Sequence, residues 1–395
     1  MKVGVFLDDY RPEDGGAFTM QGDLLRALCA SASQSSHQFV IISAQSALIK
    51  AAAEKAGLPW MPYRRPGLLE KIQVVFTRAF PNMRQQYRWR SSFERGLRKR
   101  AIDFVWFIGP RPLDLDLPYL AIVLDLQHRE QPWFPEVSEF SEWETRERRL
   151  SPFLRRAAAI IAGTQAGKEE VVNFFQVPGE RIHILPHPTP AYALEAAKHK
   201  NALDAGLGVP PGYLFYPAQF WAHKNHVNLL LALKQLRDEG LAIPLVLVGA
   251  DYGNQTHVQN TIEGLELGSQ VKVLGFVENQ TLVALYQNAL ALTYLSFFGP
   301  ENLPPLEAFA LGCPVLAAKV DGAEEQFGDA ALLVDPANPD EIAAGIRKLL
   351  KNKKLRNALV AKGDKRAKRW TAKDFVQGVF EILDEFEPVR RTWKS

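Results

Sequence analysis

The stretch "FFGPENLPPLEAFALGCPV", residues 297–315, decides the fold that the sequence predicts. It follows an apolar run, "LALTYL" at 290–295, and passes through a Gly-Pro turn before two adjacent prolines, Pro304 and Pro305. Proline suits the first turn of a helix, because its fixed φ is helical and its missing N–H would have no partner there. The stretch therefore predicts a buried strand, a turn, and a helix that begins at the prolines.

The composition indicates a globular protein with more than one core. A chain of 395 residues is too long for one ordinary core, so we expect two domains of roughly 200 residues each. The formal net charge of +3 does not by itself imply a nucleic-acid partner. Cys29 and Cys313 are the only cysteines, which excludes a disulfide framework and a Cys-rich zinc site.

The sequence also limits the expected location. It has no apolar span of 18 residues, and its first residues, "MKVGVFLDDY", resemble a short strand followed by acids rather than a signal peptide. We therefore expect a protein that is not exported and does not cross a membrane. Together with the low cysteine content, this predicts a cytoplasmic location.

Short apolar runs alternate with longer amphipathic segments along the whole chain, which predicts an α/β fold with parallel sheets covered on both faces. A stretch rich in Pro, Ala and Gly between 186 and 212 is the expected linker between two doubly wound domains. Ligands of such sheets bind beyond the carboxyl ends of the strands. The expected strands are 2–7, 38–43, 103–108, 119–124, 158–163 and 182–186 in the first half, and 213–218, 244–250, 270–276, 290–295, 313–318 and 330–335 in the second.

The helix start in the opening stretch is a candidate anion site. The backbone amides of Asn302 and Leu303 are expected to be free at the positive end of the helix dipole, where a phosphate is favoured. Glu307 is expected in the first turn of this helix. Its carboxylate either accepts hydrogen bonds from sugar hydroxyls or only complements the dipole, and this residue alone does not decide between the two.

A second helix start, in residues 216–236, carries His223, Lys224 and His226. The helix dipole disfavours cations at this position, so a negative ligand would compensate for them. The alternative is a lysine whose flexible stem carries its charge into water. Two helix starts of this kind in one domain favour a diphosphate ligand.

A third stretch, in the first half, places Gly15 and Gly16 between the first strand and a helix. Paired glycines allow a ligand to approach the backbone closely and supply unhindered N–H donors. Alone they are a weak signal, because no third glycine stands at the spacing of a dinucleotide fingerprint. Facing the second domain across a cleft, they would form a wall for a phosphate or an acceptor.

These three stretches, in this order and at these separations, resemble the retaining GT-B glycosyltransferases of glycosyltransferase family 4. Residues 163–190 are similar to the last strand-helix-strand of that family's first domain, and 303–317 with 322–346 resemble its C-terminal signature. The resemblance implies two Rossmann-like domains facing a cleft and a retaining transferase that needs no bound metal or other cofactor. It divides the chain into an acceptor-side domain at 1–190, a linker at 191–212, a nucleotide-sugar domain at 213–375 and a helix at 376–395 that crosses back to the first domain.

The resemblance also implies roles at the donor site. Lys224 would neutralise the diphosphate of a nucleotide sugar and help the nucleotide leave, and Glu307 would bind the ribose hydroxyls. Cleavage at the anomeric carbon leaves negative charge on the diphosphate, so fixed cations and amides stabilise the transition state most. The remaining implied donor contacts are Asn302 and Leu303 toward the sugar and its phosphate, Phe276 and Val277 toward the base, and Gly15 and Gly16 in the glycine loop.

The sequence departs from this family's pattern at the donor site. Where the family commonly has the first of two glutamates, this chain has Gly299, so Glu301 would have to reach the sugar from a reshaped loop. The family's typical arginine is Gln219 here. Lys224 would then hold the phosphates with one of the neighbouring histidines.

The cleft of the first domain departs from the pattern too. A histidine-aspartate pair common in the family reads Leu124-Asp125 here, with His128 nearby, so Asp125 and His128 are the catalytic candidates of this side. His128 could equally be a solvated or hydrogen-bonded loop residue. Trp133 and Phe134 of the same loop fit either packing or a surface that stacks on sugars.

Two further patterns concern a possible metal site and the kind of acceptor. Asp114 and Asp116 mimic a metal-binding Asp-x-Asp, but prolines flank them and the resembled fold uses lysine instead, so we expect no metal site. The basic run at 84–100, interleaved with aromatics, is either a solvated helix face or a peripheral contact with the inner face of a membrane that carries a lipid-linked acceptor.

Together these patterns predict an enzyme that moves a hexose or deoxyhexose from a nucleotide diphosphate sugar to a glycan or lipid-linked glycan acceptor in surface polysaccharide synthesis. The glycan acceptor follows from the resemblance and not from any residue. The alternative is a catalytically silent relative that binds a nucleotide sugar or scaffolds a partner transferase, which Gly299 and Gln219 motivate. Turnover separates the two.

Overall fold

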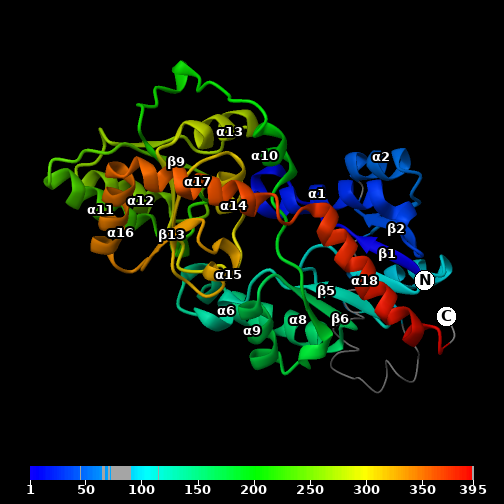
Figure 1. Cartoon of the computed structure of the whole chain (residues 1–395). Helices are drawn as coiled ribbons and strands as arrows, with labels where there is room; N and C mark the ends of the chain where they lie inside the picture. Colours follow the sequence, from blue (N-terminus) through cyan, green and yellow to red (C-terminus); the bar gives the residue numbers. More distant parts are fainter. Residues whose placement is uncertain (45, 65–66, 70–71, 73–89, 114, 394–395) are drawn as a thin grey trace.

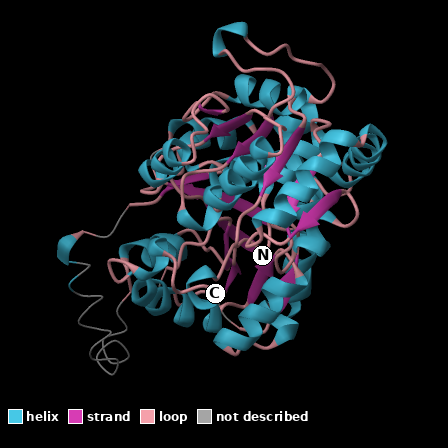
Figure 2. Cartoon of the chain, turned by 90° about the vertical axis from the view of Figure 1, so that its left-hand side faces the viewer, coloured by secondary structure: helices cyan, strands magenta, loops and turns pink. Residues whose placement is uncertain are grey.

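The computed structural model describes residues 1–44, 46–64, 67–69, 72, 90–113 and 115–393. In these residues two parallel sheets form the cores of two α/β domains, one of seven strands in the order β3-β2-β1-β4-β5-β6-β7 and one of six in the order β10-β9-β8-β11-β12-β13. Helices cover the sheets, and the two domains lie side by side (Figures 1 and 2). The expected doubly wound architecture is confirmed, while the exact bounds between the domains stay predictions.

The first sheet draws its strands from the first half of the chain. Each expected strand is present, and β3 is an additional edge strand of three residues that the sequence analysis missed, because so short a run carries no readable alternation. The elements are β1 Lys2–Phe6, α1 Gly16–Ser31, β2 Gln38–Ser43, α2 Ala47–Lys55, β3 Trp60–Pro62, α5 Ser92–Lys99, β4 Phe104–Phe107, β5 Tyr119–Ile122, α6 Gln127–Glu130, α7 Pro135–Ser138, α8 Glu142–Arg156, β6 Ala159–Ala162, α9 Gln165–Phe175 and β7 Ile182–Ile184.

The second sheet follows a short linker helix, α10 Ala191–Ala196, and contains every strand expected in the second half. Its elements are β8 Leu214–Pro217, α11 His226–Asp238, β9 Leu245–Val248, α12 Gln255–Gly264, β10 Val271–Val273, α13 Asn279–Asn288, β11 Ala291–Tyr294, α14 Leu303–Ala310, β12 Val315–Ala318, α15 Ala323–Phe327, β13 Ala331–Val334, α16 Pro339–Lys351 and α17 Lys353–Ala367.

Strand β4 shows why these apolar runs form central strands. Phe104 and Trp106 belong to the core on one face of the first sheet, and Val105 and Phe107 belong to the core on the other. All four side chains are fully buried. A continuous apolar run is stable as a strand only where both faces of the sheet are covered, so the pattern and the doubly wound fold require each other.

The last helix, α18 Ala372–Arg390, leaves the second domain and returns to the first, where it lies along α1 (Figure 1). The Phe380 ring stacks on Phe39 of β2 with ring centroids 5.3 Å apart. Arg390 donates to Asp103 at 2.7 Å and holds the end of the helix. The C-terminal segment is therefore part of the first domain's core.

No helix of the described residues is both long enough and apolar enough to pass through a bilayer.

Candidate functional site

A cavity of about 700 Å³ lies between the two domains. Its walls come from the start of α1 in the first domain and from the segments that follow β8, β9, β10 and β11 in the second, so it lies at the carboxyl ends of the strands. Among the described residues, the predicted site residues that line it are Gly15, Gly16, Lys224, Phe276, Val277, Glu301, Asn302, Leu303 and Glu307. Their individual roles stay predictions.

The start of α14 is built as the sequence predicts, with Asn302 before the first helical residue and prolines directly after Leu303. The backbone amide of Asn302 is nevertheless occupied, because it donates to Gln326 Oε1 at 2.9 Å. The side-chain amide of Gln326 donates back to the Asn302 carbonyl at 2.9 Å. The prediction of two free amides is wrong for Asn302, and the Leu303 amide remains as the candidate donor at this helix start.

Glu307 lies in the second turn of α14 and not in the first as expected, which weakens the reading as plain dipole complementation. It is buried and accepts a hydrogen bond from the Tyr286 hydroxyl at 2.6 Å. Burial raises the pKa of Glu307, while hydrogen bonds from Tyr286 and Tyr192 lower it in part. Two tyrosines thus fix the orientation of a carboxylate that faces the cavity.

Lys224 is the last residue of a short 3-10 turn, Ala222–Lys224, directly before α11. Its Nζ donates to the Tyr294 hydroxyl at 3.0 Å and lies 5.4 Å from the centre of that ring. The same hydroxyl donates to Asn302 Oδ1 at 2.9 Å. Tyr294 therefore connects the lysine of one helix start to the Asn302 of the other.

The two histidines of this turn do not add positive charge, contrary to the sequence analysis. Burial lowers the pKa of His223 to about 4 and that of His226 to about 3, so both rings are neutral at neutral pH. His226 lies against Tyr216 and Phe220, each with ring centroids 4.9 Å away. Lys224 supplies the positive charge of this turn on its own.

Glu301 points across the domain boundary. The backbone N–H of His187 donates to its Oε1 at 2.6 Å, and Gly163 of the first domain lies opposite, where a Cβ would be only 1.3 Å from Oε2. Burial raises the pKa of Glu301 to about 8, so it is mostly an uncharged acid at neutral pH. It lines both the main cavity and a neighbouring one of about 330 Å³, which Arg366 and Arg369 also line.

The backbone conformation and the close neighbours of Gly299 disfavour a glutamate at this position. Its φ is 131°, a conformation that favours glycine. A Cβ there would lie 2.7 Å from the side-chain amide of Asn302, which donates to the Gly299 carbonyl at 2.9 Å. A larger residue would have to reshape the loop that begins the site.

Asp125 and His128 do not line the cavity. His128 is fully buried, its Nε2 lies 2.8 Å from Glu147 Oε1, and burial lowers its pKa. Asp125 accepts from the backbone N–H of Gln127 at 3.2 Å and lies 3.4 Å from Arg146. Both side chains thus organise their own loop, and a catalytic role for either stays a prediction.

The remaining predictions concern Gln219, the Asp-x-Asp pattern and the basic run. Gln219 lines the cavity and accepts from Trp221 Nε1 at 3.1 Å. Asp116 forms an ion pair with Arg156 at 3.1 Å, whereas Asp114 and residues 84–89 of the basic run lie outside the described residues. In the described part of the chain no cluster of three or more His, Cys, Asp or Glu side chains could hold a metal ion.

The sequence analysis missed the residues that hold these groups in place. Tyr294 stands at the end of an expected strand, so its position at a carboxyl edge could have marked it. Tyr286 and Gln326 lie on helices far along the chain, where only the tertiary fold brings them to the site.

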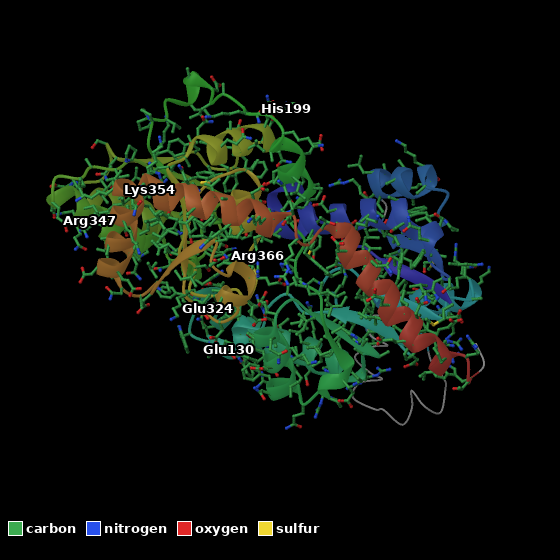
Figure 3. All side chains as sticks on the ribbon, viewed as in Figure 1. Glu130, His199, Glu324, Arg347, Lys354 and Arg366 are labelled. Atoms are coloured by element: carbon green, nitrogen blue, oxygen red, sulfur yellow. The ribbon has the colours of Figure 1, made fainter. Side chains whose placement is uncertain are left out.

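Figure 3 shows Glu130 and Glu324 on either side of the boundary between the domains, where α6 and α15 face each other.

Comparison with known proteins finds a family that part of the chain matches. Residues 204–366 match the family described as "Glycosyl transferases group 1". The chain is 28% identical over 236 residues to the O-antigen chain mannosyltransferase B of Escherichia coli, covering 57% of this chain and 60% of that protein. It is 22% identical to the O-antigen chain mannosyltransferase RfbU of Salmonella typhimurium, covering 51% and 53%. The aligned part thus spans little more than half the length of these relatives.

Solved structures share the fold over nearly the whole chain. A glycosyltransferase from Rickettsia africae superposes with a TM-score of 0.69 at 13% identity, covering 97% of this chain and 98% of that one. The Anabaena protein HepE in complex with UDP and glucose gives a TM-score of 0.69 at 17% identity, with 98% and 100% covered. At such identities the likeness shows a shared fold of two facing Rossmann-like domains and no more.

Proposed function

Because residues 204–366 match the group 1 glycosyl transferases and the chain has the GT-B fold, we propose that it is a retaining glycosyltransferase that uses a nucleotide diphosphate sugar. The transferred group is a hexose or deoxyhexose, and the acceptor is a glycan or lipid-linked glycan of surface polysaccharide synthesis. One observation carries the proposal: Lys224, the start of α14 and Glu307 face one cavity between the domains. The relatives that are O-antigen mannosyltransferases support the acceptor class.

The cavity suits a donor that bridges these groups. Lys224 and the Leu303 amide would hold the diphosphate, Glu307 the ribose hydroxyls, and the half-exposed Phe276 with Val277 the base. When the bond between the anomeric carbon and the phosphate oxygen breaks, its electron pair stays on the diphosphate. The lysine charge and the helix dipole oppose this growing negative charge, so they stabilise the transition state more than the bound donor.

Independence from a metal is also a proposal, and Lys224 supports it. The Lys224 ammonium group already lies where the proposal places the diphosphate, and its Nζ donates to the Tyr294 hydroxyl at 3.0 Å. A divalent ion would have to share that space. If the proposal holds, donor turnover persists in excess chelator.

Contact with a membrane at 84–100 is proposed on charge alone. The described part of this run forms α5, whose Phe93 packs on Phe6 with ring centroids 5.7 Å apart, so this aromatic faces the core. Arg95 and Lys99 of the same helix are exposed. Binding of the full chain to vesicles with and without anionic lipid tests this contact, because a lipid surface would be recognised through charge.

A silent relative remains the second candidate, and Gly299 favours it. As a glycine, it presents no acid at the position where the family's pattern has a glutamate. Such a protein would bind nucleotide without releasing it from a sugar.

The test is nucleotide release from a panel of UDP-, GDP-, ADP- and dTDP-sugars, measured with candidate acceptors present. Lys224→Ala and Glu307→Ala should abolish release from the one accepted donor. Lys354→Ala is the matched control, an exposed lysine near the start of α17 that lies away from the boundary between the domains (Figure 3). Binding without release, in every combination, would establish the silent relative instead.

A further inference from the structure

A loop of the first domain contacts the turn Ala222–Lys224 of the second domain, called here the Lys224 turn. The loop covers residues 127–136 and includes α6 and the start of α7. Gln131 Nε2 donates to the Phe297 carbonyl at 2.9 Å, and the Phe134 ring lies 6.0 Å from the Phe297 ring. This loop therefore contacts the segment between β11 and α14, on which the donor site is built.

Glu136 makes the most specific of these contacts. Its Oε1 accepts from the backbone N–H of His223 at 3.2 Å and from the His223 ring Nδ1. Gln127 Nε2 donates to the same oxygen at 3.3 Å and orients the carboxylate from its own domain. The Glu136 side chain is almost fully buried, with 5% of its surface exposed.

The protonation states make this contact strong. Burial raises the pKa of Glu136, but the hydrogen bonds from His223 outweigh it and lower the pKa, so the group is ionised at neutral pH. Burial lowers the pKa of His223 to about 4, so the ring is neutral and donates its Nδ1–H. An ionised acceptor with buried donors forms hydrogen bonds about twice as strong as neutral ones.

The turn held by Glu136 ends in Lys224. Within the second domain, the His223 carbonyl accepts the backbone N–H of Phe297 at 2.8 Å, and the Tyr216 hydroxyl bonds the Lys224 carbonyl. Both partners of each of these two contacts belong to the second domain. The bonds to Glu136 join the two domains, so they require the first domain to contact the second.

We propose that Glu136 is a positioning residue that fixes the Lys224 turn when the two domains close, so that the diphosphate is stabilised fully only in the closed enzyme. This deepens the proposed function and rests on it. Glu136 itself does not line the donor cavity, and it acts through His223. Such an arrangement would favour bond cleavage only once the acceptor side is in place.

The test compares Glu136→Ala with Glu136→Gln, which keeps an acceptor oxygen at the same position. Glu139→Ala is the control, an exposed glutamate three residues further along the chain. Thermal unfolding verifies that each variant folds. The measurements are kcat and KM for nucleotide release, the Kd of the free nucleotide, and the radius of gyration from X-ray scattering with nucleotide bound.

We expect Glu136→Ala to lower kcat by about tenfold or more, the loss typical of a buried charged hydrogen bond, with a nearly unchanged nucleotide Kd. Its radius of gyration should exceed that of the unmodified protein, and Glu136→Gln should restore most of both properties. A His223→Ala,Glu136→Ala double variant should be little worse than either single change, because both remove one contact.

Three kinetic results would overturn the proposal: an unchanged kcat in Glu136→Ala, equal effects of the changes at 136 and 139, or fully additive losses with His223→Ala. The scattering measurement needs no turnover, so it tests the domain contact even if no sugar donor is used. Absence of release by the unmodified protein would sink the proposed function, whereas an unchanged radius of gyration in Glu136→Ala would sink the role of Glu136.

Discussion

Replacing Glu301 by glutamine should change how the stability of the protein depends on pH. Burial raises the pKa of this carboxyl from 4.5 to about 8 in the folded chain. Between these values the folded state keeps the proton and the unfolded chain releases it, so the free energy of unfolding falls as pH rises. Each pKa unit corresponds to about 1.4 kcal/mol, which gives an upper limit of about 5 kcal/mol across the window.

Glutamine is almost the same size and does not titrate, and its Oε1 can still accept the His187 N–H. Glu301→Gln should therefore match the unmodified protein at about pH 5 and be more stable by several kcal/mol at about pH 8. Other titrating groups, such as Glu170, are common to both proteins and cancel in the difference. Glu324→Gln, an exposed glutamate in the second domain, should show no such trend.

The assay is urea unfolding followed by tryptophan fluorescence at about pH 5, about pH 6.5 and about pH 8. The quantity of interest is the difference in the free energy of unfolding between Glu301→Gln and the unmodified protein. A difference that stays constant over the three pH values would refute the reasoning, because it would mean that Glu301 titrates at the same pH in the folded and unfolded chains.

Further expectations concern single contacts of the site and the core. Tyr294→Phe removes the hydroxyl between Lys224 and Asn302 and should slow nucleotide release by about tenfold, with little change in thermal unfolding. Gly163→Ala should displace the Glu301 carboxylate, since its Cβ would overlap that group, and steady-state kinetics should show a loss of activity that Gly179→Ala, with no Cβ contact closer than 3.7 Å, does not share. Phe380→Ala should lower the free energy of unfolding of the first domain by about 3–5 kcal/mol in a urea titration, because a buried aromatic leaves a cavity.

Much of the fold could be predicted because the strands carry their burial in their sequence. Val105 and its neighbours are apolar on both faces, and only a covered parallel sheet satisfies that pattern. The short edge strand β3 could not be found, because its three residues are held by pairing with β2 and not by their own propensity. Prolines marked the start of α14, because their fixed φ and missing N–H suit the first turn of a helix.

The site could be predicted in its positions but not in its electrostatics. Lys224 follows strand β8 and Glu307 follows strand β11, so the sequence could place both near the carboxyl edge of one sheet. The neutral state of His223 could not be predicted, because it results from burial in the folded chain, which outweighs the opposite effect of Glu136, 87 residues away in the sequence. Long-range partners of this kind have no local signature.

The returning helix α18 determines the order in which the two domains are completed during synthesis. A ribosome makes the first sheet early, yet the apolar surface around Phe39 stays uncovered until Phe380 has been made. The domain that starts first is therefore finished last, and for the time needed to make the whole second domain it exposes surface of the kind that chaperones bind.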